Sequence, residues 1–129
     1  MGRRYSVVIA DDNDMMRSIL RAMLRGDHYE VIGEARNGQA AIDIVERLKP
    51  DVVCLDVMMP EKNGIEVLCA IKASQPSIEV VMVTGNSDPE TVQEAIGNGA
   101  SAFIIKPFNA ARVLDTLQKI TQRIRQKKG

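Results

Sequence analysis

The residues Asp51-Val52-Val53-Cys54-Leu55-Asp56 give the clearest indication of the fold of this protein. Its four central apolar residues are too few for an ordinary helix and are typical of a strand buried on both faces in a parallel sheet. This strand ends at Asp56, and open α/β sheets bind their ligands at the carboxyl ends of their strands. We therefore expect the other functional residues to converge on Asp56.

Apolar runs elsewhere predict four more strands, over residues 6–10, 29–35, 79–83 and 102–105. The run at 29–35 includes charged residues and is typical of a sheet edge. Apolar residues at helical spacing predict a helix after each strand. The inward faces of these helices would hold Met15, Met16, Ile19, Leu20, Met23 and Leu24; Ala41, Ile44, Val45 and Leu48; Ile65, Leu68 and Ile71; Val92, Ala95 and Ile96; and Val113, Leu114, Leu117, Ile120 and Ile124. This alternation with short connections predicts an α/β fold, a doubly wound (βα)5 sandwich around a parallel sheet.

Length and composition exclude several classes of function. The 129 residues suffice for one domain, and we expect residues 1–129 to form a single domain without an additional output domain. The net charge is zero and only 3% of the residues are aromatic, so neither charge nor base stacking favours direct nucleic-acid binding. The terminal cations suit the negative end of the last helix; they are Arg123, Arg125, Lys127 and Lys128. Because the start lacks a long apolar stretch, we expect a cytoplasmic protein with no membrane attachment.

Three smaller features give further expectations. Cys54 and Cys69 lack the spacing of a metal or disulfide site, and we expect both to be core thiols in a reducing compartment. The loop after Asp56 reaches Gly64, which we expect to supply a positive φ. The helix that starts at Asp88-Pro89 has a thin apolar stripe, which indicates that it can shift.

Polar residues follow four of the five predicted strands. They are Asp11 and Asp12, Asp56, Thr84, and Lys106. Taken singly, most of them have a simpler explanation, as a helix cap, a turn residue or a solvated cation. Taken together, they all fall at strand carboxyl ends, which meet at one edge of a parallel sheet. Independent structural roles do not predict this coincidence, whereas a functional site does.

The chemistry of these residue types indicates phosphoryl transfer. Three clustered carboxylates repel one another unless a cation lies among them, and hard oxygen ligands of this kind suit Mg²⁺. A shielded Asp56 carboxylate can attack phosphorus and form an aspartyl phosphate. Lys106 and the Thr84 hydroxyl are the donors available to neutralise the phosphoryl oxygens. Gly85, without a side chain, would leave room for a bulky phosphodonor.

In these motifs the chain resembles the receiver domains of two-component response regulators, the CheY-like family. The matching residues follow the family's order and spacing across nearly the whole chain; they are Asp11-Asp12, Asp56, Met59-Pro60, Asn63-Gly64, Thr84-Gly85 and Lys106-Pro107. The resemblance implies a flavodoxin-like sheet of strand order 2-1-3-4-5. It also implies a phosphorelay signalling protein rather than an enzyme, phosphorylated by a sensor histidine kinase or a phosphotransfer protein.

The same resemblance assigns roles at the site. Asp56 would be the phosphoacceptor. Asp12, Asp56 and the backbone carbonyl of Met58 would bind Mg²⁺, and Asp11 would act on the ion through water. Lys106 would contact the phosphoryl group.

The resemblance also implies a switch. Thr84 would contact and move toward the phosphoryl group while Phe103 packs inward behind it, and the Lys106-Pro107 peptide would be cis. These movements would remodel the face made by the helix from Pro89, the strand 102–105 and the last helix. A downstream protein target would dock there, and phosphorylation could also produce a homodimer.

Three positions bear on how such a protein would behave. Phe103 lacks the hydroxyl of a tyrosine, so a partner contact that needs this group is absent. Met58 and Asn86 flank the phosphoryl position in the family and tune hydrolysis there. Because an apolar Met58 cannot hold a water molecule by hydrogen bonding, we expect a phosphoryl lifetime that is not especially short.

Three other functions compete with this interpretation. A phosphatase or phosphotransferase with an aspartyl nucleophile usually has a second acid two residues later, where this chain has Met58. A nucleotide- or flavin-binding module needs a glycine-rich phosphate cradle where this chain has Ala10-Asp11-Asp12-Asn13. A receiver-like interaction module that is never phosphorylated would not need the full set of site residues.

Overall fold

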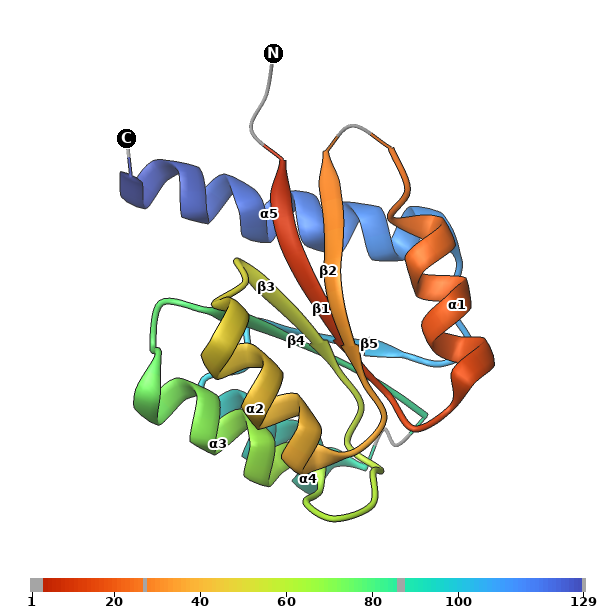
Figure 1. The fold of residues 1–129 in the computed structure, drawn as a ribbon, viewed down its shortest axis with the longest axis vertical. Helices are drawn as coiled ribbons and strands as arrows, with labels where there is room; N and C mark the ends of the chain where they lie inside the picture. Colours follow the sequence, from red (N-terminus) through yellow and green to blue (C-terminus); the bar gives the residue numbers. More distant parts are fainter. Residues whose placement is uncertain (1–3, 27, 86–87, 129) are drawn as a thin grey trace.

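One parallel sheet with helices on both faces forms the centre of the protein (Figure 1). The computed structural model describes residues 4–26, 28–85 and 88–128. Within these residues the strands are β1 (Tyr5–Ala10), β2 (Tyr29–Ala35), β3 (Val52–Leu55), β4 (Glu79–Thr84) and β5 (Ala102–Ile105). The helices are α1 (Asp14–Met23), α2 (Gly38–Leu48), α3 (Gly64–Ser74), α4 (Pro89–Gly97) and α5 (Ala110–Lys128). The predicted alternation of strand and helix is confirmed.

The strands are all parallel and run in the order β2-β1-β3-β4-β5, as the resemblance implies. β3 lies in the centre, and all four of its residues are buried because helices cover both faces. β2 lies at an edge, as its charged residues predicted. The pairing of β1 with β2 is irregular, with a shift of register between Val7 and Val8.

Two apolar clusters, one on each face of the sheet, make the core. The first joins alternate strand residues to α1 and α5, and includes Ile9, Cys54, Leu20 and Leu117. The second joins the intervening strand residues to α2, α3 and α4, and includes Leu55, Val45, Leu68 and Ala95. Figure 1 shows this division, with α1 and α5 on one side of the sheet and the other helices opposite.

Five predicted core assignments are wrong, those of Met15, Ile19, Cys69, Ile96 and Leu114, all of which are exposed. The Met15 side chain is 72% exposed and Ile19 is 38% exposed, because α1 presents only a narrow stripe around Leu20 to the sheet. Cys54 is buried as predicted, whereas Cys69 lies on the outer face of α3 and is exposed. Burial raises the pKa of the Cys54 thiol to about 12.

The anchor of α4 is as thin as the sequence predicts. Ala95 is its only fully buried residue among those described, and Ile96 is 57% exposed. A helix with so little buried apolar surface has a low local stability. Among the described helices, none is both long and apolar enough to cross a membrane.

Candidate functional site

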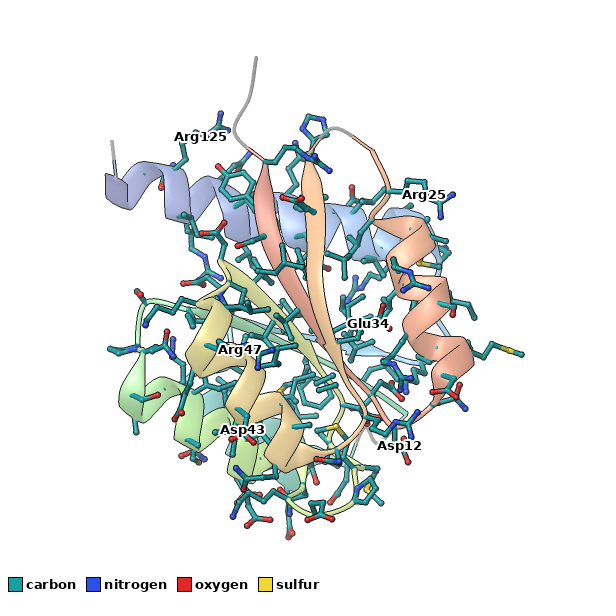
Figure 2. All side chains as sticks on the ribbon, viewed as in Figure 1. Asp12, Arg25, Glu34, Asp43, Arg47 and Arg125 are labelled. Carbon is teal, nitrogen blue, oxygen red and sulfur yellow. The ribbon has the colours of Figure 1, made fainter. Side chains whose placement is uncertain are left out.

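The carboxyl ends of β1, β3, β4 and β5 bring the predicted polar residues to one edge of the sheet. Figure 2 shows Asp12 at this end of the molecule, with Arg25 and Arg125 at the opposite end. Asp11 and Asp56 directly follow β1 and β3, and their side chains are almost completely buried. The predicted convergence on Asp56 therefore depends on topology, because these residues are far apart in the chain.

Three carboxylates cluster at this edge. The ligand oxygens of Asp11, Asp12 and Asp56 all lie within 4.8 Å of one another. The Asn13 backbone N–H donates to Asp11 Oδ1 at 2.9 Å, and the Met58 N–H donates to Asp56 Oδ1 at 3.2 Å. These bonds orient the two buried carboxylates, while Asp12 remains exposed to solvent.

Helix capping does not account for the acidic pair. The N-cap of α1 is Asn13, whose side chain accepts a hydrogen bond from the Met16 N–H at 2.9 Å. The simpler explanation of Asp11 and Asp12 as cap residues is therefore excluded. Their carboxylates remain available to the cluster.

Lys106 supplies the cation that this cluster needs. Its Nζ lies 2.9 Å from Asp11 Oδ2 and 3.2 Å from Asp56 Oδ2. Partial burial acts to lower the pKa of the ammonium, but hydrogen bonds and charge interactions with Asp11 and Asp56 outweigh it, and the pKa lies above its usual value. The lysine is therefore charged at neutral pH and bridges two acids from different strands.

The donor set fits a hard divalent cation. Oxygens of two buried carboxylates and one exposed carboxylate lie within 4.8 Å of one another, and the exposed Asp12 leaves one side of the cluster open to water. Mg²⁺ prefers one or two carboxylates, with water and substrate oxygens completing its octahedron. Asp11, Asp12 and Asp56 could hold such an ion, and the Met58 carbonyl lies in the same loop.

The loop after Asp56 is held by close backbone contacts at two glycines. Gly64 N–H donates to the Val57 carbonyl at 2.8 Å, and Gly38 N–H donates to the Pro60 carbonyl at 3.1 Å. A Cβ on Gly64 would lie 2.1 Å from the Asp56 carbonyl oxygen, and one on Gly38 would lie 2.0 Å from the Lys62 carbonyl oxygen. Both helices can approach the loop only because glycine begins each of them.

The prediction of a positive φ at Gly64 is wrong. The residue of this loop with a positive φ is Glu61, at 73°. Gly64 instead begins α3, directly after the Asn63 cap, and its missing Cβ allows the close approach to Asp56. Gly38 has the same role on α2, and sequence reasoning missed it because the contact joins segments that are distant in the chain.

The remaining predicted residues lie around the cluster. Thr84 ends β4 and is completely buried, and its carbonyl accepts a hydrogen bond from the Lys106 N–H at 2.9 Å. The Lys106–Pro107 peptide is cis, as the resemblance implies. Phe103 is half-buried against the second apolar cluster, and Met58 is 64% exposed. Asn86 lies outside the described residues.

Comparison with known proteins identifies the family. Residues 7–118 match the response regulator receiver domain family. The chain belongs to this family. Among curated proteins, the receiver domain is similar to chemotaxis protein CheY of Listeria monocytogenes, with 41% identity over 113 residues, which are 88% of this chain and 95% of that protein.

Solved structures agree with this assignment. The response regulator domain of Thermotoga maritima CheB superimposes with a TM-score of 0.83 at 33% identity, covering 93% of this receiver domain and 96% of that chain. CheY in a CheX-CheY-BeF3-Mg²⁺ complex from Borrelia burgdorferi gives a TM-score of 0.87 at 26% identity, covering 91% and 89% of the two chains. The receiver domain is thus CheY-like in sequence and in fold.

Proposed function

We propose that this receiver domain is a cytoplasmic phosphorelay switch that accepts a phosphoryl group on Asp56. The observation that carries the proposal is the Lys106 ammonium, which bridges Asp11 and Asp56 next to the exposed Asp12. A sensor histidine kinase or a phosphotransfer protein would be the donor. The domain would be a signalling protein that assists its own phosphorylation and dephosphorylation, not an enzyme with outside substrates.

The proposed step is a substitution at phosphorus. An Asp56 carboxylate oxygen attacks the phosphoryl group, the bond from phosphorus to the donor's histidine nitrogen breaks, and the imidazole leaves with the electron pair of that bond. The Met58 N–H and the Lys106 Nζ each bond one Asp56 oxygen, so the carboxylate is oriented before the donor arrives. Lys106 and the Thr84 hydroxyl would then bond the phosphoryl oxygens.

A metal ion would assist this chemistry. Mg²⁺ bound by Asp12, Asp56 and the Met58 carbonyl, with Asp11 acting through water, would neutralise charge on the phosphoryl oxygens. Asp11 keeps its bond to Lys106, so the ammonium stays at the site when a phosphoryl group takes up the Asp56 oxygen.

The output would be a change of the face formed by α4, β5 and α5. Two large apolar side chains, Ile96 of α4 and Ile105 of β5, are partly exposed. The thin anchor of α4 supports movement there, with Thr84 and Phe103 as the switch residues. A downstream protein, or a second phosphorylated copy, would bind this face.

The lifetime of the aspartyl phosphate would depend on Met58 and Asn86. The exposed Met58 side chain offers no strong hydrogen-bonding group to a hydrolytic water, so we propose a lifetime that is not especially short. The test compares the loss of labelled phosphate from the wild type and from Met58→Asn. Faster loss from the wild type would refute this part of the proposal.

The proposed function is tested with acetyl phosphate as a small phosphodonor. Wild-type protein incubated with acetyl phosphate and Mg²⁺ is expected to gain one base-labile phosphate, measured by intact mass, and Asp56→Asn is expected to gain none. The matched control Asp51→Asn removes an acid at the other end of β3 and should still be phosphorylated. If neither acetyl phosphate nor a cognate kinase modifies the wild type, the domain is a receiver-like interaction module instead.

A further inference from the structure

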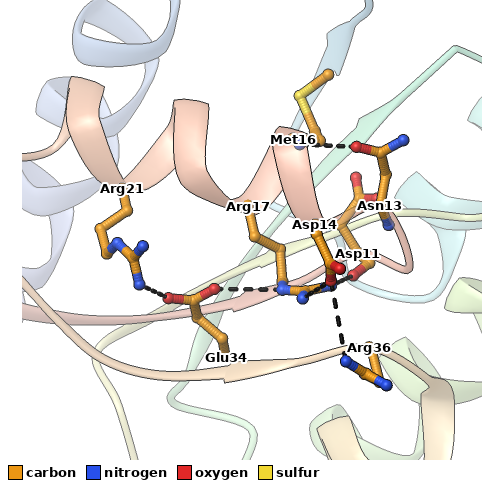
Figure 3. Close-up of polar contacts among 8 residues, drawn as sticks. All are labelled: Asp11, Asn13, Asp14, Met16, Arg17, Arg21, Glu34 and Arg36. Carbon is orange, nitrogen blue, oxygen red and sulfur yellow. Dashed lines mark hydrogen bonds and ion pairs between the residues drawn. The ribbon is translucent and has the colours of Figure 1, made fainter.

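Arg17 of α1 reaches the backbone of the acidic cluster. Its guanidinium Nη1 donates to the Asp11 carbonyl oxygen at 2.6 Å (Figure 3). That carbonyl belongs to the peptide joining Asp11 to Asp12, which supply two of the three clustered carboxylates. The Arg17 side chain is only 11% exposed, so this is a largely buried contact.

Two acids hold Arg17 in this position. Its Nε lies 3.2 Å from Glu34 Oε1, and another nitrogen of the guanidinium pairs with Asp14. Arg21, one turn further along α1, pairs with the second oxygen of Glu34. Figure 3 shows Arg17 between Glu34 on one side and the Asp11 backbone on the other. The planar guanidinium can satisfy several acceptors at once, which a lysine ammonium cannot do with the same geometry.

An irregularity of β2 directs Glu34 toward these arginines. Val7 is paired with Val31, but Val8 is paired with Gly33, so Ile32 is an extra residue. A slip of one residue moves a side chain to the other face of a sheet. With regular pairing Glu34 would lie opposite Ala10, whose side chain belongs to the cluster with α2 and α3.

With the extra residue, Glu34 lies opposite Ile9 instead. Ile9 belongs to the cluster that contains Leu20 of α1, so Glu34 faces the helix that carries Arg17. Bulges of this kind commonly redirect a side chain next to a functional site. Gly33 of the bulge packs closely against α2, because a Cβ there would lie 2.5 Å from Ile44 Cδ1.

We infer that Arg17, oriented by Glu34, is a positioning residue that fixes the Asp11–Asp12 peptide and so sets the affinity of the acidic cluster for a divalent cation. The inference rests on the proposed function. The Asp11 N–H is held by the Ala35 carbonyl at 3.0 Å, and Arg17 holds the carbonyl on the other side of the residue. Partners of this type orient the ligands of a metal and strongly affect its affinity.

The direction in which the Mg²⁺ affinity changes when Arg17 is replaced distinguishes a positioning role from an effect of its charge alone. Arg17 is a cation near three carboxylates, so if it acted only through its charge, its removal would strengthen the binding of another cation. Positioning predicts the opposite result, because a free Asp11–Asp12 peptide must be ordered when the ion binds. Arg21 is the matched control, since it has the same charge and the same Glu34 partner but lies one helical turn further from Asp11 along α1.

The experiment measures Mg²⁺ affinity by calorimetric titration of the wild type, Arg17→Met, Arg17→Lys and Arg21→Met. Both Arg17 variants are expected to bind Mg²⁺ about 10-fold or more weakly, and Arg21→Met to stay close to the wild type. In metal-free protein, hydrogen exchange of the Asn13 amide, which donates to Asp11 Oδ1, should be faster in the Arg17 variants only. Far-UV circular dichroism checks that each variant folds, and Arg17→Lys carries the test if Arg17→Met does not fold.

Unchanged or tighter Mg²⁺ binding by the Arg17 variants would overturn the inference and leave the proposed function intact. Equal weakening in Arg21→Met would also overturn it, because the effect would then follow charge or helix stability. If the wild type itself fails to bind Mg²⁺, the proposed function fails and the inference fails with it.

Discussion

Replacing Gly64 with alanine should strain the structure next to Asp56, the proposed phosphoacceptor. The new Cβ would lie 2.1 Å from the Asp56 carbonyl oxygen and 2.7 Å from Val57 Cα, whereas real Cβ contacts are not shorter than 3.0 Å. The opposing atoms are backbone, so no side chain can rotate out of the way. The start of α3 must therefore move away from the end of β3 by roughly 1 Å, against the tight packing of the protein interior.

The expected cost follows from that displacement. Overpacking in a rigid environment typically costs 1–3 kcal/mol, and a backbone collision belongs at the upper end, so we expect a loss of about 3 kcal/mol in the free energy of unfolding. For a domain of this size such a loss lowers the Tm by about 10 °C. Since native domains have a stability of about 5–15 kcal/mol, the variant should still fold.

The assay is urea unfolding followed by far-UV circular dichroism, because the chain contains no tryptophan. The control is Gly97→Ala, where a Cβ would meet nothing within 4 Å; that variant should be unchanged or slightly more stable. Gly64→Asn separates close approach from a positive φ, because asparagine tolerates the left-handed region but still carries a Cβ. A loss below about 1 kcal/mol in Gly64→Ala, or a stable Gly64→Asn, would refute the argument.

Three further predictions concern Lys106 and the thiols. Lys106→Met removes the cation that competes with Mg²⁺ for Asp11 and Asp56. This variant should therefore bind Mg²⁺ more tightly than the wild type, as measured by calorimetry, and should accept phosphate from acetyl phosphate more slowly, as measured by intact mass. Weaker Mg²⁺ binding would contradict the prediction. Because the pKa of Lys106 is raised by folding, its contribution to stability is complete below the unfolded lysine pKa of about 10.4 and is lost as pH rises through the folded value. Urea unfolding across that pH range should therefore show that the free energy of unfolding falls less with rising pH in Lys106→Met than in the wild type. An equal fall in both proteins would contradict this prediction. A thiol reagent should modify Cys69 quickly in the native protein and Cys54 only after unfolding, as followed by peptide mass; rapid native labelling of Cys54 would contradict its burial.

The centre of the fold and most of the site could be predicted because they depend on short apolar runs and on topology. The buried run that ends at Asp56 is specific for a central parallel strand, and parallel strands bring their carboxyl ends to one edge. Asp11 and Lys106 could therefore be placed beside Asp56 without knowledge of any contact. Their distances in the structure agree with that placement.

The errors arose where the outcome depends on contacts between distant segments. Periodicity places Met15 and Ile19 on the apolar side of α1, but it does not show how narrow the stripe is that packs on the sheet. A glycine in a loop suggests a positive φ. Gly64 is instead required because the Asp56 carbonyl, across the loop, leaves no space for a Cβ. Gly33 inside β2 is a signal of a bulge, but it does not show which side chains the bulge redirects, so the Glu34 contact with Arg17 could not be predicted.

The position of the phosphoryl group is the most direct test of the account. After incubation with acetyl phosphate and Mg²⁺, borohydride reduction converts an acyl phosphate to a stable alcohol that peptide mapping can locate. The account predicts a single modified residue, Asp56, with modification that disappears when Mg²⁺ is removed by a chelator. Modification at Asp11 or Asp12 instead, or equal modification of Asp56 without Mg²⁺, would contradict it.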